Sequence, residues 1–160
     1  MTKTALITGA TSGIGEATAY ELAKHGINLI LCGRRLERLQ TIQRTLNNIC
    51  KVHILNFDVR NKMDTFKAIA SLPEPFKHID ILINNAGNAH GLDPIDHGNI
   101  DDWDAMMDIN VKGLLYVSKA IIPQMTKRQS GHIINIGSSA NKHWFFSRQR
   151  SIPKGQCVLR

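Results

Sequence analysis

Five short apolar runs alternate with helix-forming segments along the first 136 residues of the chain. The runs are Thr4–Thr8, Ile27–Cys32, Val52–Phe57, Ile79–Ile83 and Ile133–Ile136, and the helical patterns between them are Glu16–Lys24, Leu36–Leu46, Lys62–Ser71 and Trp103–Thr126. Parallel strands need a crossover connection, which a helix usually supplies. A run that is apolar throughout, such as Ile81-Leu82-Ile83, suits a sheet that is covered on both faces. The alternation therefore predicts an α/β fold with a doubly wound parallel sheet.

A glycine-rich turn, Thr8-Gly9-Ala10-Thr11-Ser12-Gly13-Ile14-Gly15, joins the first strand to the first helix. Gly9 allows a tight turn, Gly13 lets backbone approach a pyrophosphate, and Gly15 lets the helix pack close to the sheet. The helix N-terminus, with Thr11, Ser12 and Ile14 around it, would offer N–H groups to the phosphates. A turn of this kind can also bind nothing, but its place between strand and helix favours a Rossmann-type dinucleotide-binding domain.

Three further motifs follow in order. Asn84-Asn85-Ala86-Gly87 comes after the fourth run, Asn110 lies inside the long helical pattern, and Gly131-His132-Ile133-Ile134-Asn135-Ile136-Gly137-Ser138-Ser139 contains the fifth run. Together with the glycine turn, they resemble the motifs of the short-chain dehydrogenase/reductase family. This resemblance implies hydride transfer between nicotinamide and a secondary alcohol or ketone. It is strongest to the NADP-dependent 3-hydroxy acid (serine 3-dehydrogenase type) branch, which implies a small hydroxy acid as substrate. The motif spacing fits a sugar-nucleotide epimerase less well.

The end of the second strand indicates which nicotinamide dinucleotide the chain prefers. An acidic residue there would bind the adenosine ribose in an NAD protein, but this sequence has Cys32-Gly33-Arg34-Arg35. A guanidinium can bind a 2′-phosphate, whereas a carboxylate would repel it. The sequence therefore favours NADP over NAD, although Arg34 and Arg35 could also be a solvated helix start. By the resemblance, Asp58 and Val59 contact the adenine, and Asn85, Ala86 and Gly87 pass near the cofactor ribose.

The resemblance also assigns catalytic roles. Ser138 would hydrogen-bond the substrate oxygen, and Asn110 would hold a water in the proton relay. The family's Tyr, a general acid/base, and the Lys four residues later are expected near position 151, where this chain has Ser151. The two tyrosines, Tyr20 and Tyr116, both lie upstream in predicted helices. We therefore expect little or no turnover from this chain. The alternative function is a non-catalytic dinucleotide-binding or interaction protein of the same fold.

The last twenty residues differ in character from the rest. Residues 141–160 carry five basic and no acidic residues and no apolar periodicity, so the net charge of +7 belongs mainly to this tail. We predict a Rossmann domain over residues 1–140, incomplete at its C-terminal end, and an irregular basic tail over residues 141–160. A one-base shift in a back-translation of Gly155–Arg160 permits Gly-Asn-Val-Tyr-Cys-Ala, which resembles the family's segment around its Tyr. The hypothesis is a truncation or a disrupted reading frame after about Ala140.

Composition excludes several other classes of protein. The chain shows neither a signal peptide nor a membrane-spanning run, which predicts a cytoplasmic protein without a membrane partner. Cys32, Cys50 and Cys157 are widely spaced, and no His pairs with Cys or carboxylates at ligand spacing, so no metal site is expected. Residues 1–140 have a net charge of only +2, which argues against nucleic acid. The resemblance implies a homo-oligomer formed through the helix at 103–126.

Overall fold

The computed structural model describes residues 2–91 and 93–137. Strands and helices alternate along these residues. Their order is β1 (Thr4–Thr8), α1 (Gly13–Lys24), β2 (Asn28–Gly33), α2 (Leu36–Leu46), β3 (Val52–Asn56), α3 (Lys62–Ala70), β4 (Ile81–Asn84), α4 (Ile100–Met107), the π-helical segment η1 (Asp108–Gly113), α5 (Leu114–Arg128) and β5 (His132–Asn135). The alternation of strands and helices predicted from the sequence is therefore confirmed.

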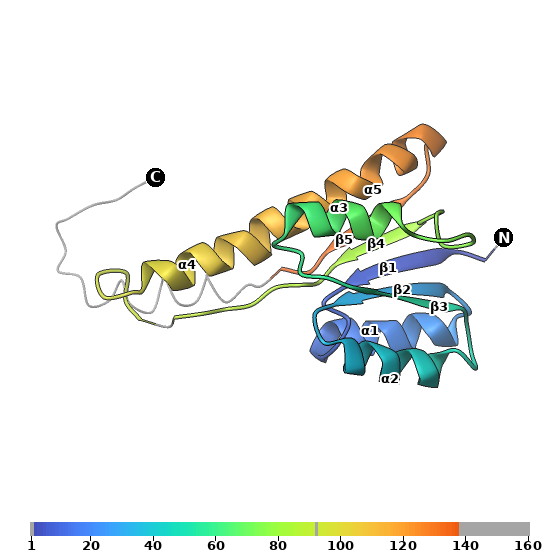
Figure 1. The fold of residues 1–160 in the computed structure, drawn as a ribbon, viewed down its shortest axis with the longest axis horizontal. Coiled ribbons are helices and arrows are strands. Elements are labelled where there is room, and N and C mark those ends of the chain that lie inside the picture. The colour runs from blue at the N-terminus through green and yellow to red at the C-terminus, as the bar shows by residue number, and fades with distance from the viewer. Residues whose placement is uncertain (1, 92, 138–160) are drawn as a thin grey trace, which may run out of the picture.

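The strands form one parallel sheet in the order β3-β2-β1-β4-β5. Helices α1 and α2 cover one face, and α3 and α5 cover the other (Figure 1). Side chains alternate between the two faces along a strand, so Leu6 and Leu82 belong to the core beneath α3 and α5, whereas Ile7 and Ile83 belong to the core beneath α1 and α2. The doubly wound α/β fold is confirmed, and the direction of winding reverses between β1 and β4.

Several predicted boundaries move by a few residues. Helix α1 begins at Gly13 rather than Glu16, so two of the motif glycines lie in its first turn. Strand β4 is Ile81–Asn84 rather than Ile79–Ile83, and β5 is His132–Asn135 rather than Ile133–Ile136. Polar residues such as Asn84 and His132 pair within the ladder because backbone hydrogen bonds, not side-chain polarity, define a strand.

The long helix predicted over Trp103–Thr126 is present, but its middle is π-helical rather than α-helical. The helix begins at Ile100, where the Asn99 side chain accepts a hydrogen bond from the Asp101 amide at 2.9 Å. It widens into the π-helical segment η1 and continues as α5 to Arg128. Apolar periodicity in a sequence does not reveal a wide turn, and such turns are frequent at functional sites. Here the wide turn contains Asn110.

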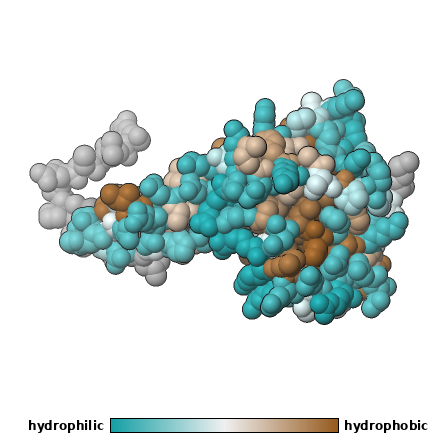
Figure 2. Space-filling view, viewed as in Figure 1, coloured by the Kyte–Doolittle hydropathy of each residue, from teal (hydrophilic) through white to brown (hydrophobic). Residues whose placement is uncertain are grey.

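Helix α4 and the loop before it project from the body of the protein as an arm (Figure 1). None of the residues of α4 is buried, and Ile95 and Ile100 near its start are 83% and 65% exposed. Hydrophobic surface is visible at the far end of this arm, surrounded by hydrophilic surface (Figure 2). Among the described residues, no helix has the length and apolar character needed to cross a membrane.

The predicted division at residue 140 and the basic tail at 141–160 lie outside the described residues. So do Ser138 and the segment on which the reading-frame hypothesis depends.

Candidate dinucleotide site

A cavity of about 740 Å³ lies at the carboxyl ends of the central strands, where the winding of the sheet reverses. Ligands of open α/β sheets characteristically bind in this position. The cavity is lined by residues predicted from the sequence, namely Gly9, Thr11, Ser12, Ile14, Arg34, Arg35, Asp58, Val59, Asn85, Ala86 and Gly87. It is also lined by four residues that the sequence did not predict, Gly33, Phe57, Ile109 and Ile136. The predicted Gly13, Gly15 and Asn110 lie outside this lining.

Each motif glycine meets a different steric demand. Gly9 and Gly13 have φ values of +65° and +59°, a region that L side chains rarely adopt. A Cβ on Gly13 would meet nothing within 4 Å, so the backbone there is open to an approaching group. A Cβ on Gly15 would collide with the Asn85 amide and lie 2.5 Å from the Gly9 carbonyl oxygen. Gly15 therefore lets α1 pack against the turn itself and against the loop after β4, rather than against the sheet alone.

The N-terminus of α1 faces this cavity through Ser12 and Ile14. Ser12 is the N-cap residue and is extended, and its side chain makes no capping hydrogen bond. The amides of the first helical turn thus lack the side-chain acceptor that usually satisfies them. Ile14 is 61% exposed despite being apolar. This combination can accept an anion beside an apolar contact surface.

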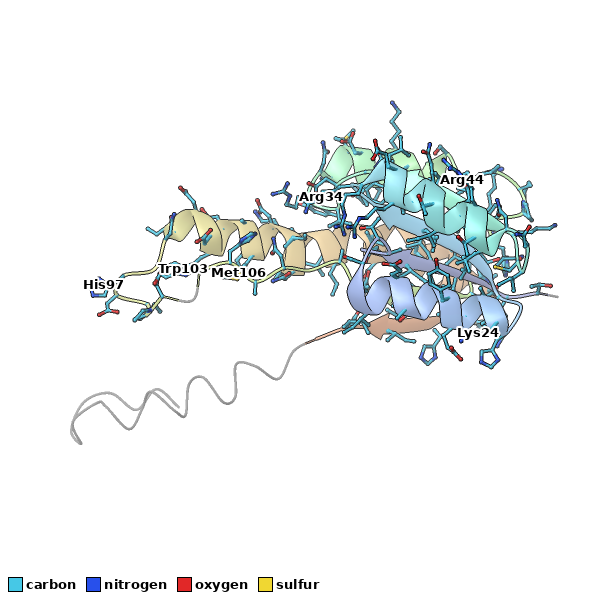
Figure 3. All side chains as sticks on the ribbon, turned by 90° about the horizontal axis from the view of Figure 1, so that it is seen from below. Lys24, Arg34, Arg44, His97, Trp103 and Met106 are labelled. Carbon is cyan, nitrogen blue, oxygen red and sulfur yellow. The ribbon has the colours of Figure 1, made fainter. Side chains whose placement is uncertain are left out.

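Two arginines after β2, Arg35 and Arg38, donate hydrogen bonds to the glycine turn. The Arg35 guanidinium donates from Nε and Nη2 to Thr11 Oγ1, at 3.1 and 2.6 Å, and from Nη2 to Ser12 Oγ at 2.7 Å. Arg38, which the sequence did not single out, donates to the Thr11 carbonyl oxygen at 3.4 Å. Arg34 lies at the end of the sheet from which the arm projects (Figure 3). The predicted cluster of positive charge at the end of β2 is therefore present.

Asp58 follows β3 and lines the same cavity as the glycine turn. Arg60 donates to both of its carboxylate oxygens, from Nε at 3.1 and 3.0 Å and from Nη2 at 2.6 Å, and the Arg60 amide adds a bond of 3.0 Å to Oδ1. Burial raises the pKa of the Asp58 carboxyl, but the hydrogen bonds and charge of Arg60 and the charge of Arg34 outweigh burial. The pKa of Asp58 therefore lies below its ordinary value. Asp58 stays ionised at neutral pH.

Thr8, the last residue of β1, connects the glycine turn to the loop after β4. Its buried Oγ1 accepts hydrogen bonds from the Asn85 and Ala86 amides, both at 3.0 Å. The Asn85 side chain donates back to the carbonyl oxygens of Thr8 and Gly9, at 3.0 and 3.1 Å. Through these bonds, Asn85 braces the loop after β4 against the end of β1. The role of Thr8 was missed, because a threonine in a strand is an ordinary residue.

Asn84 braces β4 against its other neighbours. Its buried amide nitrogen donates to Ser118 Oγ on α5 at 3.0 Å and to Asn135 Oδ1 on β5 at 2.9 Å. Its Oδ1 has no hydrogen-bond partner within the described residues. The Asn84 side chain thus holds β5, which precedes Ser138 in the sequence, in register with β4, which ends at the cavity.

Asn110 makes a reciprocal pair of hydrogen bonds with the loop after β4. Its Oδ1 accepts from the Asn88 amide at 2.9 Å and its Nδ2 donates to the Asn88 carbonyl oxygen at 2.8 Å. A Cβ on Gly87 would lie 3.0 Å from Asn110 Oδ1, so the glycine permits this pairing. The side chain predicted to hold a water therefore also positions residues 87 and 88. The other predicted catalytic residue, Ser138, lies outside the described residues.

No group of three His, Cys, Asp or Glu side chains in residues 2–91 and 93–137 is placed to hold a metal ion. Cys32 is buried in the sheet, and burial raises the pKa of its thiol above the ordinary value.

The parallel sheet and the cavity at its reversal point define a Rossmann-type α/β protein. The sequence profile described as "short chain dehydrogenase" matches residues 3–148. The chain belongs to this family of oxidoreductases.

Individual relatives agree with this assignment. The NADP-dependent 3-hydroxy acid dehydrogenase YdfG of Escherichia coli O6:H1 is 45% identical over 135 residues, covering 84% of this chain and 54% of that protein. The crystal structure of serine dehydrogenase from Escherichia coli superposes with a TM-score of 0.80 at 40% identity, covering 92% of this chain and 73% of that one. The closed form of serine dehydrogenase complexed with NADP⁺ gives a TM-score of 0.81 at 40% identity, covering 92% and 63%. The chain spans about half the length of the curated relatives it matches.

Proposed function

We propose that this chain binds NADP in the cavity at the ends of β1–β4. The observation that carries the proposal is that Arg34 and Arg35 line the cavity directly after β2, at the position where an NAD protein of this fold would have a carboxylate. A guanidinium can bind the 2′-phosphate that distinguishes NADP from NAD. The open backbone at Gly13 and the uncapped first turn of α1 suit the pyrophosphate. The NADP-dependent name of the relative in Escherichia coli O6:H1 supports the same choice.

The reaction we propose is the family's oxidoreduction of a small hydroxy acid, or of another secondary alcohol or ketone. When bound, the nicotinamide exchanges a hydride with the substrate carbon. Ser138 is proposed to hydrogen-bond the substrate oxygen, and Asn110 to position the loop at Gly87 beside the cofactor ribose and to take part in the proton relay. The name of the 3-hydroxy acid dehydrogenase supports this substrate class.

A titration with NADPH tests the cofactor proposal. We expect binding with a sub-millimolar Kd, followed by the change in nicotinamide fluorescence. Arg34→Glu should weaken binding by at least about tenfold, because a carboxylate repels the 2′-phosphate that the guanidinium attracted. Arg44→Glu makes the same change of charge at the other end of α2, away from the cavity, and should bind as the unmodified chain does (Figure 3). Equal loss in both variants, or no binding by the unmodified chain, contradicts the proposal.

A turnover assay tests whether this chain is catalytic. The sequence has no Tyr-x-x-x-Lys pair near position 151, where the family has it. The one tyrosine four residues before a lysine, Tyr20 with Lys24, lies in α1, and the other tyrosine is Tyr116. Without a general acid/base we expect NADP binding with little or no turnover of 3-hydroxy acids. Turnover well above that of a Ser138→Ala variant would overturn this expectation. Binding without turnover is also what a non-catalytic dinucleotide-binding protein of this fold would show, and this is the second candidate.

We further propose that the long helix mediates self-association. Met107, Val111 and Leu115 are four residues apart along α4, η1 and α5, and all are 40% exposed or more, as is Ile122 further along. A continuous apolar stripe on a surface helix marks an interaction face. Sedimentation of the chain at micromolar concentration should show a dimer or larger species, and Leu115→Glu should shift it toward monomer. A monomer at all concentrations refutes this proposal.

A further inference from the structure

Two arginines compete for one carboxylate at the edge of the cavity. Arg60 Nη2 lies 2.6 Å from Asp58 Oδ2, and Arg34 Nη1 lies 3.7 Å from the same oxygen. The shorter distance is a charge-assisted hydrogen bond, whereas the longer one is outside hydrogen-bonding range. Arg34 therefore forms a loose ion pair with Asp58 but no hydrogen bond to it.

Arg60 itself does not line the cavity, although Arg34 and Asp58 both do. It reaches Asp58 from two residues further along the chain, and its Nε is shared between the two carboxylate oxygens. The Arg60 amide also holds Oδ1, which fixes the direction of the carboxylate independently of the Arg60 side chain. The guanidinium of Arg60 thus occupies the oxygens that Arg34 would otherwise reach.

We propose that Arg60 is a positioning residue that determines cofactor preference by keeping Arg34 from hydrogen-bonding Asp58. This inference rests on the proposed binding of NADP. With Arg60 in place, the Arg34 guanidinium is available to a 2′-phosphate. Without Arg60, the partly buried carboxylate lacks its main partner, and the nearest cation able to replace it is Arg34. The Asp58–Arg34 pair then becomes hydrogen-bonded and has to break before Arg34 can bind a phosphate.

The ratio of the Kd for NADH to the Kd for NADPH measures this effect. Both dinucleotides carry the same adenine, pyrophosphate and nicotinamide, so any effect of Arg60 or Asp58 on those groups cancels in the ratio. Arg60→Met should lower the ratio about five- to tenfold, mainly through weaker NADPH binding. Arg60→Lys keeps the charge but not the planar fork, and should restore part of the ratio.

The decisive comparison removes the Asp58 carboxylate, which attracts both Arg34 and Arg60. In an Asp58→Asn background, Arg34 has no anion to pair with, so adding Arg60→Met should leave the ratio within about twofold of the single Asp58→Asn variant. A merely structural role, or a general loss of positive charge, would lower the ratio equally in both backgrounds and would overturn the inference. The inference also fails if Arg60→Met leaves the ratio unchanged in the otherwise unmodified chain.

Two controls help to distinguish a failure of this inference from a failure of the proposed NADP binding. Arg44→Met removes the same charge from the far end of α2 and should leave the ratio unchanged (Figure 3). Thermal unfolding of each variant shows whether it is folded at the temperature of the titration. If the unmodified chain binds NADPH and Arg60→Met has no effect on the ratio, only the inference fails. If the unmodified chain does not bind NADPH, the proposed function fails first.

Discussion

Replacing Thr8 with valine is expected to lower the free energy of unfolding by about 2–4 kcal/mol, because two amides lose their acceptor at once. Valine fills nearly the same volume but cannot accept the hydrogen bonds from Asn85 and Ala86, both of 3.0 Å. Thr8 is 2% exposed, so water cannot readily take the place of its hydroxyl group. The loop that carries Asn85 and Ala86 lines the cavity, and NADPH binding should weaken about tenfold as that loop shifts.

Thr8→Ser is the matched control for this change. It keeps the hydroxyl group and removes one buried methyl group, which should cost only about 1 kcal/mol and leave NADPH binding close to that of the unmodified chain. Chemical denaturation gives the free energies, and a fluorescence titration gives the affinities. If Thr8→Ser destabilises the chain as much as Thr8→Val does, the methyl group matters more than the hydrogen bonds and the account of Thr8 is wrong.

Adding a single methyl group at Gly15 should damage both the fold and the cavity. The Cβ of Gly15→Ala would collide with the Asn85 amide group and lie 2.5 Å from the Gly9 carbonyl oxygen. Because one of these neighbours is backbone, α1 has to move away from the turn. We expect a loss of about 1–3 kcal/mol in unfolding free energy, even though alanine is the better helix former. Gly9 and Asn85 both line the cavity, so NADPH binding should fall at least about tenfold.

Ala17→Ser serves as the control for Gly15→Ala. It adds one heavy atom at an exposed position of the same helix and should change stability by less than about 0.5 kcal/mol. Hydrogen exchange of the amides in residues 9–15 provides a local measurement, because a displaced helix start exchanges faster. An unfolding midpoint and an NADPH affinity equal to those of the unmodified chain would falsify the packing role assigned to Gly15.

The predictions made from the sequence differ in quality for a physical reason. Apolar runs and helical periods correctly predicted every strand and helix of the described residues, but not the π-helical segment within the helix at Trp103–Thr126. Periodicity reports which face of an element is buried, and that information is local. It does not report the width of a helical turn, which in η1 accompanies the pairing of Asn110 with Asn88. The cavity-lining residues Phe57 and Ile109 were missed for another reason. Apolar residues at such positions normally belong to a core, and periodicity does not show that they also line a cavity.

The glycine turn and the arginines after β2 could be predicted because their chemistry is carried by adjacent residues. Gly9 and Gly13 have the positive φ values that favour glycine, and Arg34 and Arg35 stand where a carboxylate would otherwise meet the ribose. The sequence by itself thus determined the fold class, the place of the cavity and the sign of its charge. The tertiary structure alone decided which groups hold that cavity in shape: Thr8 bonded to an amide 77 residues away, Asn110 bonded to Asn88 across 22 residues, and Arg60 rather than Arg34 on Asp58. Such pairs depend on which chain ends the sheet brings together, and on a difference of about an ångström between two competing cations. Neither leaves a periodic signal along the chain.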